Sequence, residues 1–119
     1  MISPFANDPF ALVWEAFKNL YPDKECTCFF DIKEEKTEEG EDIFGETFFG
    51  DDGNIDVFVD ARLSINDAVE VFAHELAHVT VGNGAGHGPE WEDAFEKIFS
   101  EYNRIGEKLF DVPTEENNV

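Results

Sequence analysis

All three histidines of the chain, His74, His78 and His87, lie within the segment from position 74 to position 87. Residues 74–78 read H-E-L-A-H, and two helical residues four positions apart share one face. Their imidazole nitrogens can therefore reach one metal ion, and Glu75 is placed to take a proton from a water at that ion. His87 is the obvious third ligand. Three ligands leave one position open, as a catalytic zinc requires.

The residues around this motif predict that it lies on a buried helix. Apolar side chains flank it on both sides, and a helix that is apolar on nearly all sides is a buried one. Ser64 followed by Asp67 is typical of a helix start, and Gly82 suits the position after the last turn, so we expect a helix over 65–81. Buried polar groups are paired or bind a metal, so a metal explains the motif better than a solvated face.

A second helix follows a glycine-rich loop. The glycines of residues 82–86 permit a sharp reversal that brings His87 back over the metal. Pro89 suits the first turn of the next helix, which carries one apolar stripe. The stripe consists of Trp91, Phe95, Ile98, Tyr102, Ile105 and Leu109. Because zinc also accepts carboxylates, an acidic residue of this helix is the alternative third ligand. The candidates are Glu90, Glu92, Asp93 and Glu96.

H-E-x-x-H at 74–78, followed by H-G-P-E-W at 87–91, resembles the SprT/Spartan-type zinc metalloproteases, including the related WLM group. The resemblance is tight over about residues 64–99. It implies a zincin-like fold and one zinc ion per chain, held by His74, His78 and His87, with Glu75 as the general base. The size of the chain is also similar to that of minimal gluzincin peptidases, in which a downstream helical glutamate is the third ligand.

The remaining sequence predicts an α+β fold in a single domain over residues 1–119. The expected elements are an N-terminal helix over 9–20, three strands over 26–32, 43–49 and 54–59, the metal helix and the C-terminal helix. We expect a small, mostly antiparallel sheet, a charged loop or hairpin tip over 33–42, and a polar tail from about Thr114. Strand 54–59 is either an unpaired edge that holds an extended substrate or a fully paired structural strand.

The charge of the chain restricts its partners. Acidic residues outnumber basic ones by 28 to 8, which gives a net charge of −20. Phosphate contacts need lysine and arginine, so we expect no nucleic-acid binding, and anionic membranes are disfavoured. Solubility explains the charge, and the sharper alternative is a surface that mimics DNA or binds a basic partner. Between positions 34 and 60, Lys36 is the only basic residue, which favours a basic or neutral peptide substrate.

Two features indicate a cytoplasmic protein. Cys26 and Cys28 are the only cysteines, and a disulfide between strand residues two positions apart would be strained, so we expect reduced thiols. The first residues lack the basic region and long apolar run of a signal peptide, and no segment reaches membrane-spanning length.

The sequence favours a zinc-dependent endopeptidase. A metal-activated water would attack the peptide carbonyl, while Glu75 takes the proton of that water and passes it to the leaving amine. Tyr102 and Arg104 are candidates to support the oxyanion. The alternative is a catalytically idle, zinc-stabilised acidic protein that occupies a basic partner. The presence of Glu75 favours the enzyme, because a purely structural zinc site needs no base there.

Overall fold

The computed structural model describes residues 5, 7–32 and 44–109. The described part of the chain is an α+β structure. Its elements are α1 (Pro9–Leu20), β1 (Thr27–Asp31), β2 (Gly45–Phe49), β3 (Ile55–Asp60), α2 (Ile65–Val81) and α3 (Pro89–Leu109). The predicted loop over 33–42, the first residue of the predicted strand 43–49 and the predicted tail from Thr114 lie outside the described residues.

The predicted bounds of α1 and α2 are confirmed, because the capping residues act as the sequence indicates. Asp8 Oδ1 accepts a hydrogen bond from Phe10 N at 3.0 Å, and Ser64 Oγ accepts one from Asp67 N at 3.2 Å. Each bond satisfies a backbone donor that the first helical turn leaves without an intrahelical partner. At its other end α2 stops at Gly82, which has a φ of 94°, a conformation that glycine adopts at little cost.

The sheet is mixed, so the expectation of a mostly antiparallel sheet is wrong. β3 lies in the centre, antiparallel to β2 and parallel to β1. The short turn after β2, in which Gly50 N donates to Asn54 O at 2.8 Å, forces β2 and β3 into a hairpin. The order of the strands also corrects the edge-strand hypothesis for residues 54–59. That strand is paired on both sides, and the edges of the described sheet are β1 and β2.

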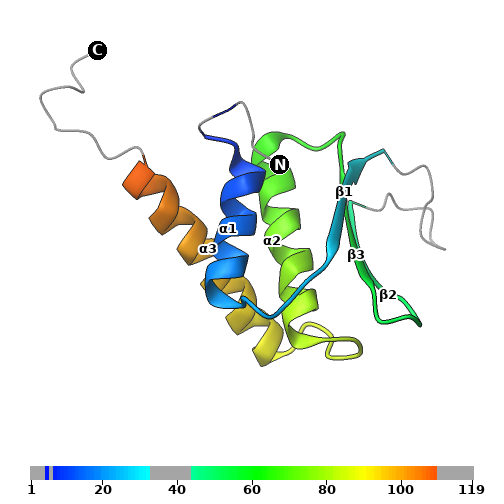
Figure 1. Cartoon of the computed structure of the whole chain (residues 1–119). Helices are drawn as coiled ribbons and strands as arrows, with labels where there is room; N and C mark the ends of the chain where they lie inside the picture. The colour runs from blue at the N-terminus through cyan, green and yellow to red at the C-terminus, as the bar shows by residue number, and fades with distance from the viewer. Residues whose placement is uncertain (1–4, 6, 33–43, 110–119) are drawn as a thin grey trace, which may run out of the picture.

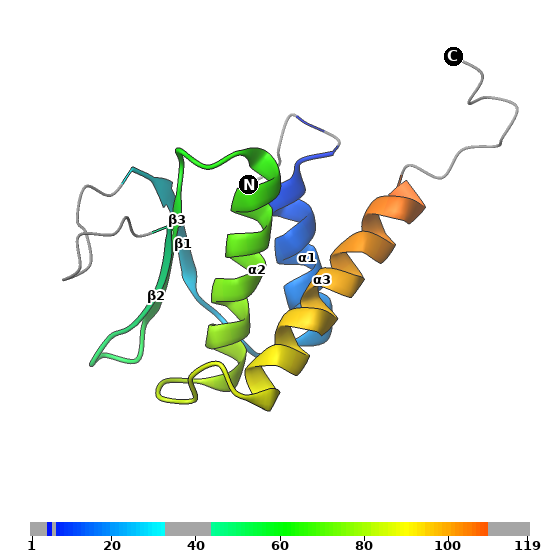
Figure 2. The ribbon, with the colours of Figure 1, turned by 180° about the vertical axis from the view of Figure 1, so that it is seen from behind.

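All three helices lie on one side of the sheet (Figure 1). α2 packs directly on β2 and β3, and α1 and α3 pack on α2, as the view from behind also shows (Figure 2). α2 is therefore enclosed, as its apolar sequence predicts, and Ala73, Leu76 and Ala77 are fully buried. Truncating a buried leucine such as Leu76 to alanine costs roughly 2–5 kcal/mol, so this helix is a major part of the core.

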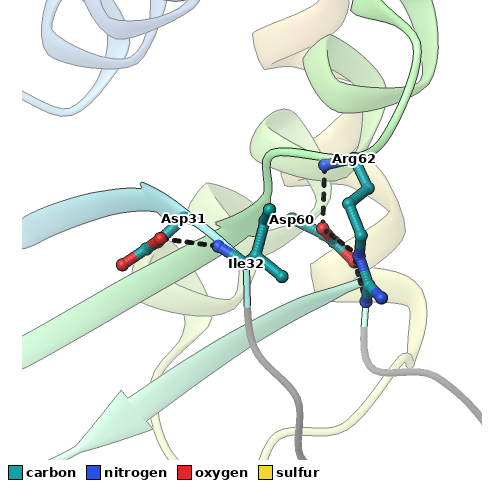
Figure 3. A network of polar contacts seen from close by, with 4 residues as sticks. All are labelled: Asp31, Ile32, Asp60 and Arg62. Atoms are coloured by element: carbon teal, nitrogen blue, oxygen red, sulfur yellow. Dashed lines mark hydrogen bonds and ion pairs between the residues drawn. The ribbon is translucent and has the colours of Figure 1, made fainter.

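An ion pair between the buried Asp60 and the exposed Arg62 fixes the connection from β3 into α2 (Figure 3). The side chain of Asp60 is 0% exposed. Its Oδ1 accepts from Arg62 N at 2.9 Å, and its Oδ2 accepts from Arg62 Nη2 at 2.7 Å. The hydrogen bonds from the guanidinium hold the pKa of Asp60 below its usual range. Because α2 begins directly after this turn, the pair helps to set where the histidines of α2 lie.

The two cysteines are free thiols, as predicted, and their Sγ atoms lie 3.8 Å apart. Their mutual hydrogen bond lowers the pKa of Cys26 and raises that of Cys28. None of the described helices combines the length and the apolar composition that crossing a bilayer requires.

Candidate metal centre

The three histidines converge on one point. His74 and His78 lie on α2, and His87 lies in the loop two residues before α3. His87 Nε2 is 2.9 Å from His78 Nε2 and 3.2 Å from His74 Nε2. Nitrogen ligands at the usual zinc distance stand about 3.3 Å apart in a tetrahedral site. The three residues could therefore hold one metal ion.

The loop between α2 and α3 brings His87 back to α2 by means of its glycines. Gly82, Gly84 and Gly86 have φ values of 94°, 86° and 65°, which residues with a side chain rarely adopt. The chain therefore reverses tightly between the two helices (Figure 2). The reversal that the glycine spacing predicts is confirmed.

The structure groups His87, and no carboxylate of α3, with the two histidines of α2. Among the residues that the structure describes, the three histidines are the one group of potential ligands close enough to share an ion. The acidic residues of α3 join no such group there. Asp93 instead pairs with Lys97, with 2.9 Å between Oδ2 and Nζ.

Burial keeps the α2 histidines in the neutral form that binds a metal. Desolvation, together with the neighbouring His78 and His87, lowers the pKa of His74 to about 4. Desolvation and His87 also lower the pKa of His78. Metal ions compete with protons for the imidazole nitrogen, so these shifts favour metal binding at acidic pH.

Trp91 holds the site from the side of α3. Its ring packs on the His74 ring with 4.6 Å between centroids, and its Nε1 donates to His74 O at 3.2 Å. The sequence placed Trp91 in the H-G-P-E-W motif and in an apolar stripe, and neither pattern assigned it a contact with His74. Its second role depends on the crossing of α2 and α3, which helical spacing alone does not reveal.

Glu75 is buried beside the histidines and faces β2. Its side chain is hydrogen bonded by Thr47 Oγ1, 2.7 Å from Oε1, and its Oε2 lies 3.9 Å from His74 Nε2. Desolvation by burial raises the pKa of Glu75 to about 7. The hydrogen bond from Thr47 lowers this pKa, and the nearby charge of Glu46 raises it slightly. A carboxylate with a pKa near 7 can both accept and release a proton at neutral pH.

Strand β2 contributes two residues that no sequence motif marks. Thr47 binds Glu75, and Gly45 leaves space for it. A Cβ on residue 45 would stand 2.8 Å from Glu75 Oε2 and would overlap Cγ1 of Val71. These roles arise only when β2 packs on α2, so spacing along the chain could not show them. The available signal was a glycine inside a strand, which often marks a close approach.

The two residues considered for oxyanion support have their recorded contacts away from the histidines. Arg104 Nε pairs with Glu101 Oε1 at 2.7 Å. Tyr102 lines a hollow of about 850 Å³ near Ile65, at the start of α2, and none of the three histidines lines that hollow.

A smaller hollow of about 360 Å³ adjoins the histidine cluster. It has apolar and acidic walls, and His74 forms one side of it. The other lining residues are Phe44, Leu63, Asp67, Glu70 and Val71. The hollow therefore offers space for a side chain directly beside the candidate metal ligands.

Comparison of the chain with protein-family models, with curated proteins and with solved structures gave no match. The resemblance to SprT-type proteases therefore rests on the residues of the motif. The arrangement of the three histidines and Glu75 is the basis on which a function can be inferred.

Proposed function

We propose that the protein is a zincin-like, zinc-dependent endopeptidase. In this proposal His74, His78 and His87 hold one zinc ion, and Glu75 is the general base. The observation that carries the proposal is the convergence of three imidazole nitrogens beside a buried carboxylate. Within the described residues no fourth side chain joins the group. That ligand set leaves a coordination position for water or substrate, as in a catalytic zinc site.

The residues of the site support a hydrolytic mechanism. A bound zinc ion lowers the pKa of water towards about 7 and polarises a peptide carbonyl. Glu75 would take the proton of the attacking water and later give it to the leaving amine. Because Thr47 binds Oε1, Oε2 is the oxygen that takes part in proton transfer.

β2 is the strand that would hold the substrate. Within the described sheet it pairs only with β3, and an unpaired edge can bind an extended peptide through its backbone. The hollow beside His74 would receive one substrate side chain. Asp67 and Glu70 in its lining, and the net charge of −20, support a basic side chain at that position.

Hydrolysis of a labelled unfolded protein, such as casein, by the zinc-loaded chain tests the proposal. Glu75→Gln keeps the size of the side chain but cannot accept the proton, so we expect folding and zinc binding to persist while the rate falls at least about a hundredfold. Glu107→Gln, at an exposed position of α3, is the matched control and should keep full activity. A zinc-loaded parent that cleaves no unfolded protein would contradict the enzyme and favour the acidic binding protein.

A further inference from the structure

The face of the sheet that turns away from α2 carries phenylalanines, and none of the described helices covers it. A sheet face that helices do not cover normally carries polar residues. Phe29 of β1 and Phe58 of β3 are register partners. Phe48 of β2 lies on the same face, opposite Asp56 of β3. Phe29 is 51% exposed and Phe48 is 59% exposed. We call Phe29, Phe48 and Phe58 the outer aromatic face.

The outer aromatic face is hollowed and rimmed by acids. The three rings line a hollow of about 400 Å³ together with the carboxylates of Asp31, Glu46 and Asp56. The described helices all lie on the other side of the sheet (Figures 1 and 2). Exposed apolar patches with a polar rim mark interaction sites on soluble proteins.

We propose that the outer aromatic face binds a segment of another protein in which basic and apolar side chains share one surface. The rings provide apolar contact area for the partner. The aliphatic stems of lysine or arginine can lie across the rings, and their cations interact favourably with the ring faces. The same cations can reach the carboxylates that line the hollow with the rings, where charge-assisted hydrogen bonds form.

Charge complementarity selects this occupant over others. A second copy of the chain would bring the same carboxylates and another net charge of −20 against the first. Like charges placed opposite one another disfavour such a complex. Anionic lipids and nucleic acids are disfavoured by the same field. A partner with both apolar and basic side chains can pack on the phenylalanine rings and pair with the carboxylates.

The outer aromatic face and the candidate metal centre lie on opposite sides of the sheet. Thr47 points inwards to Glu75, while its neighbours Glu46 and Phe48 line the outer hollow. A partner bound outside therefore leaves the histidines accessible. The inference goes beyond the proposed function and does not require that the chain hydrolyse peptides.

Binding of designed peptides to the full chain tests the inference. The probe is a short, fluorescently labelled amphipathic helical peptide of lysine and leucine. Its binding to the chain is measured by fluorescence anisotropy. One comparison peptide replaces lysine with glutamate, and a second replaces leucine with serine. Mass spectrometry after each titration verifies that the peptide is intact.

Two double variants and two controls locate the binding surface. Phe29→Ser with Phe48→Ser should weaken binding at least about tenfold, the loss typical of truncated aromatic anchors. Asp31→Asn with Asp56→Asn should weaken it severalfold and reduce its dependence on salt. Phe5→Ser with Ile65→Ser removes two exposed apolar side chains elsewhere, and Asp23→Asn with Glu107→Gln removes two exposed acids elsewhere. Both controls should bind as the parent does.

Several results would overturn the inference. These are no binding of the lysine–leucine peptide, equal binding of either comparison peptide, or parental affinity in the phenylalanine variant. Sedimentation of the parent as a dimer that Phe29→Ser with Phe48→Ser converts to a monomer would assign the face to a second copy instead. Thermal melting of each variant verifies folding, and the aspartate variant tests the face even if the phenylalanine variant does not fold.

Discussion

The hydroxyl of Thr47 lies 2.7 Å from Oε1 of Glu75 and 3.1 Å from the carbonyl oxygen of the same residue. One side chain of β2 thus contacts both the side chain and the backbone of the residue between the histidines of α2. A buried carboxylate needs such a partner, because desolvation without a hydrogen bond is costly. The contact engages Oε1 and leaves Oε2 without a hydrogen bond from Thr47.

Thr47→Val should lower kcat about tenfold or more and change KM little. The substitution keeps the shape of the side chain but removes a hydrogen bond to an ionisable group, worth about 1.5–3 kcal/mol. Steady-state kinetics on a peptide substrate measures the effect. Thr47→Ser, which restores the hydroxyl, should recover most of the rate. A valine variant with parental kcat would show that the hydrogen bond does not position Glu75.

Gly45→Ala should destabilise the fold by about 1–3 kcal/mol, the usual cost of overpacking. The added Cβ overlaps Val71 and crowds Glu75, so β2 must move away from α2. Urea unfolding measures the change. Gly106→Ala is the matched control, since a Cβ there meets no atom within 4 Å and alanine is favoured over glycine within a helix. Equal stability of the Gly45→Ala variant and the parent would contradict the close approach.

Purified protein should bind one equivalent of zinc, and His87→Ala should lose most of the affinity. Ligand binding stabilises the folded state, so chelation should also lower the Tm of the parent. Glu90→Ala and Glu96→Ala serve as controls and should bind zinc normally. Loss of zinc in a glutamate variant, with retention in His87→Ala, would assign the third ligand to α3 as in the gluzincin alternative.

The response of stability to pH should reveal the opposite pKa shifts of His74 and Glu75. Below pH 6.5 the His74 side chain takes up a proton in the unfolded chain. In the folded protein, where its pKa is about 4, the same side chain stays neutral. Acidification therefore destabilises the metal-free protein through His74. Folded Glu75, with a pKa of about 7, holds a proton that the unfolded chain, with a pKa of 4.5, releases. Acidification from pH 7 to 4.5 therefore stabilises it through Glu75.

Glu75→Gln removes the second effect alone. The metal-free variant should lose stability more steeply than the parent between pH 6.5 and 4.5, by up to about 1.4 kcal/mol per pH unit, the value for one proton. Urea unfolding at several pH values measures the slopes. Glu92→Gln should follow the parent. Equal slopes for Glu75→Gln and the parent would mean that the Glu75 pKa is not raised in the folded state.

Local sequence signals predicted the helices and the histidine cluster. The caps at Asp8 and Ser64 act within their own first turns, and the spacing of His74 and His78 is a property of one helix. The reversal before His87 depends on glycines next to it. These features need no knowledge of distant residues, which is why the sequence alone was sufficient.

The arrangement of the strands could not be predicted in the same way. β1 pairs with β3 in the sheet, although β2 lies between them in the sequence. Strand periodicity carries no information about which strand is central. The contact of Thr47 with Glu75 and the outer position of Phe48 both depend on this order. The mixed sheet, the support for Glu75 and the outer aromatic face were therefore visible only in three dimensions.

The chain should bind neither single- nor double-stranded DNA at physiological salt, and the proposed proteolysis should not depend on added DNA. Lysine and arginine make the phosphate contacts that dominate non-specific affinity. The chain has only eight of them against 28 acids. Among the described residues Lys18, Arg62, Lys97 and Arg104 already pair with carboxylates. Fluorescence anisotropy with labelled oligonucleotides checks the binding. Micromolar or tighter affinity, or a cleavage rate that DNA stimulates, would contradict this prediction.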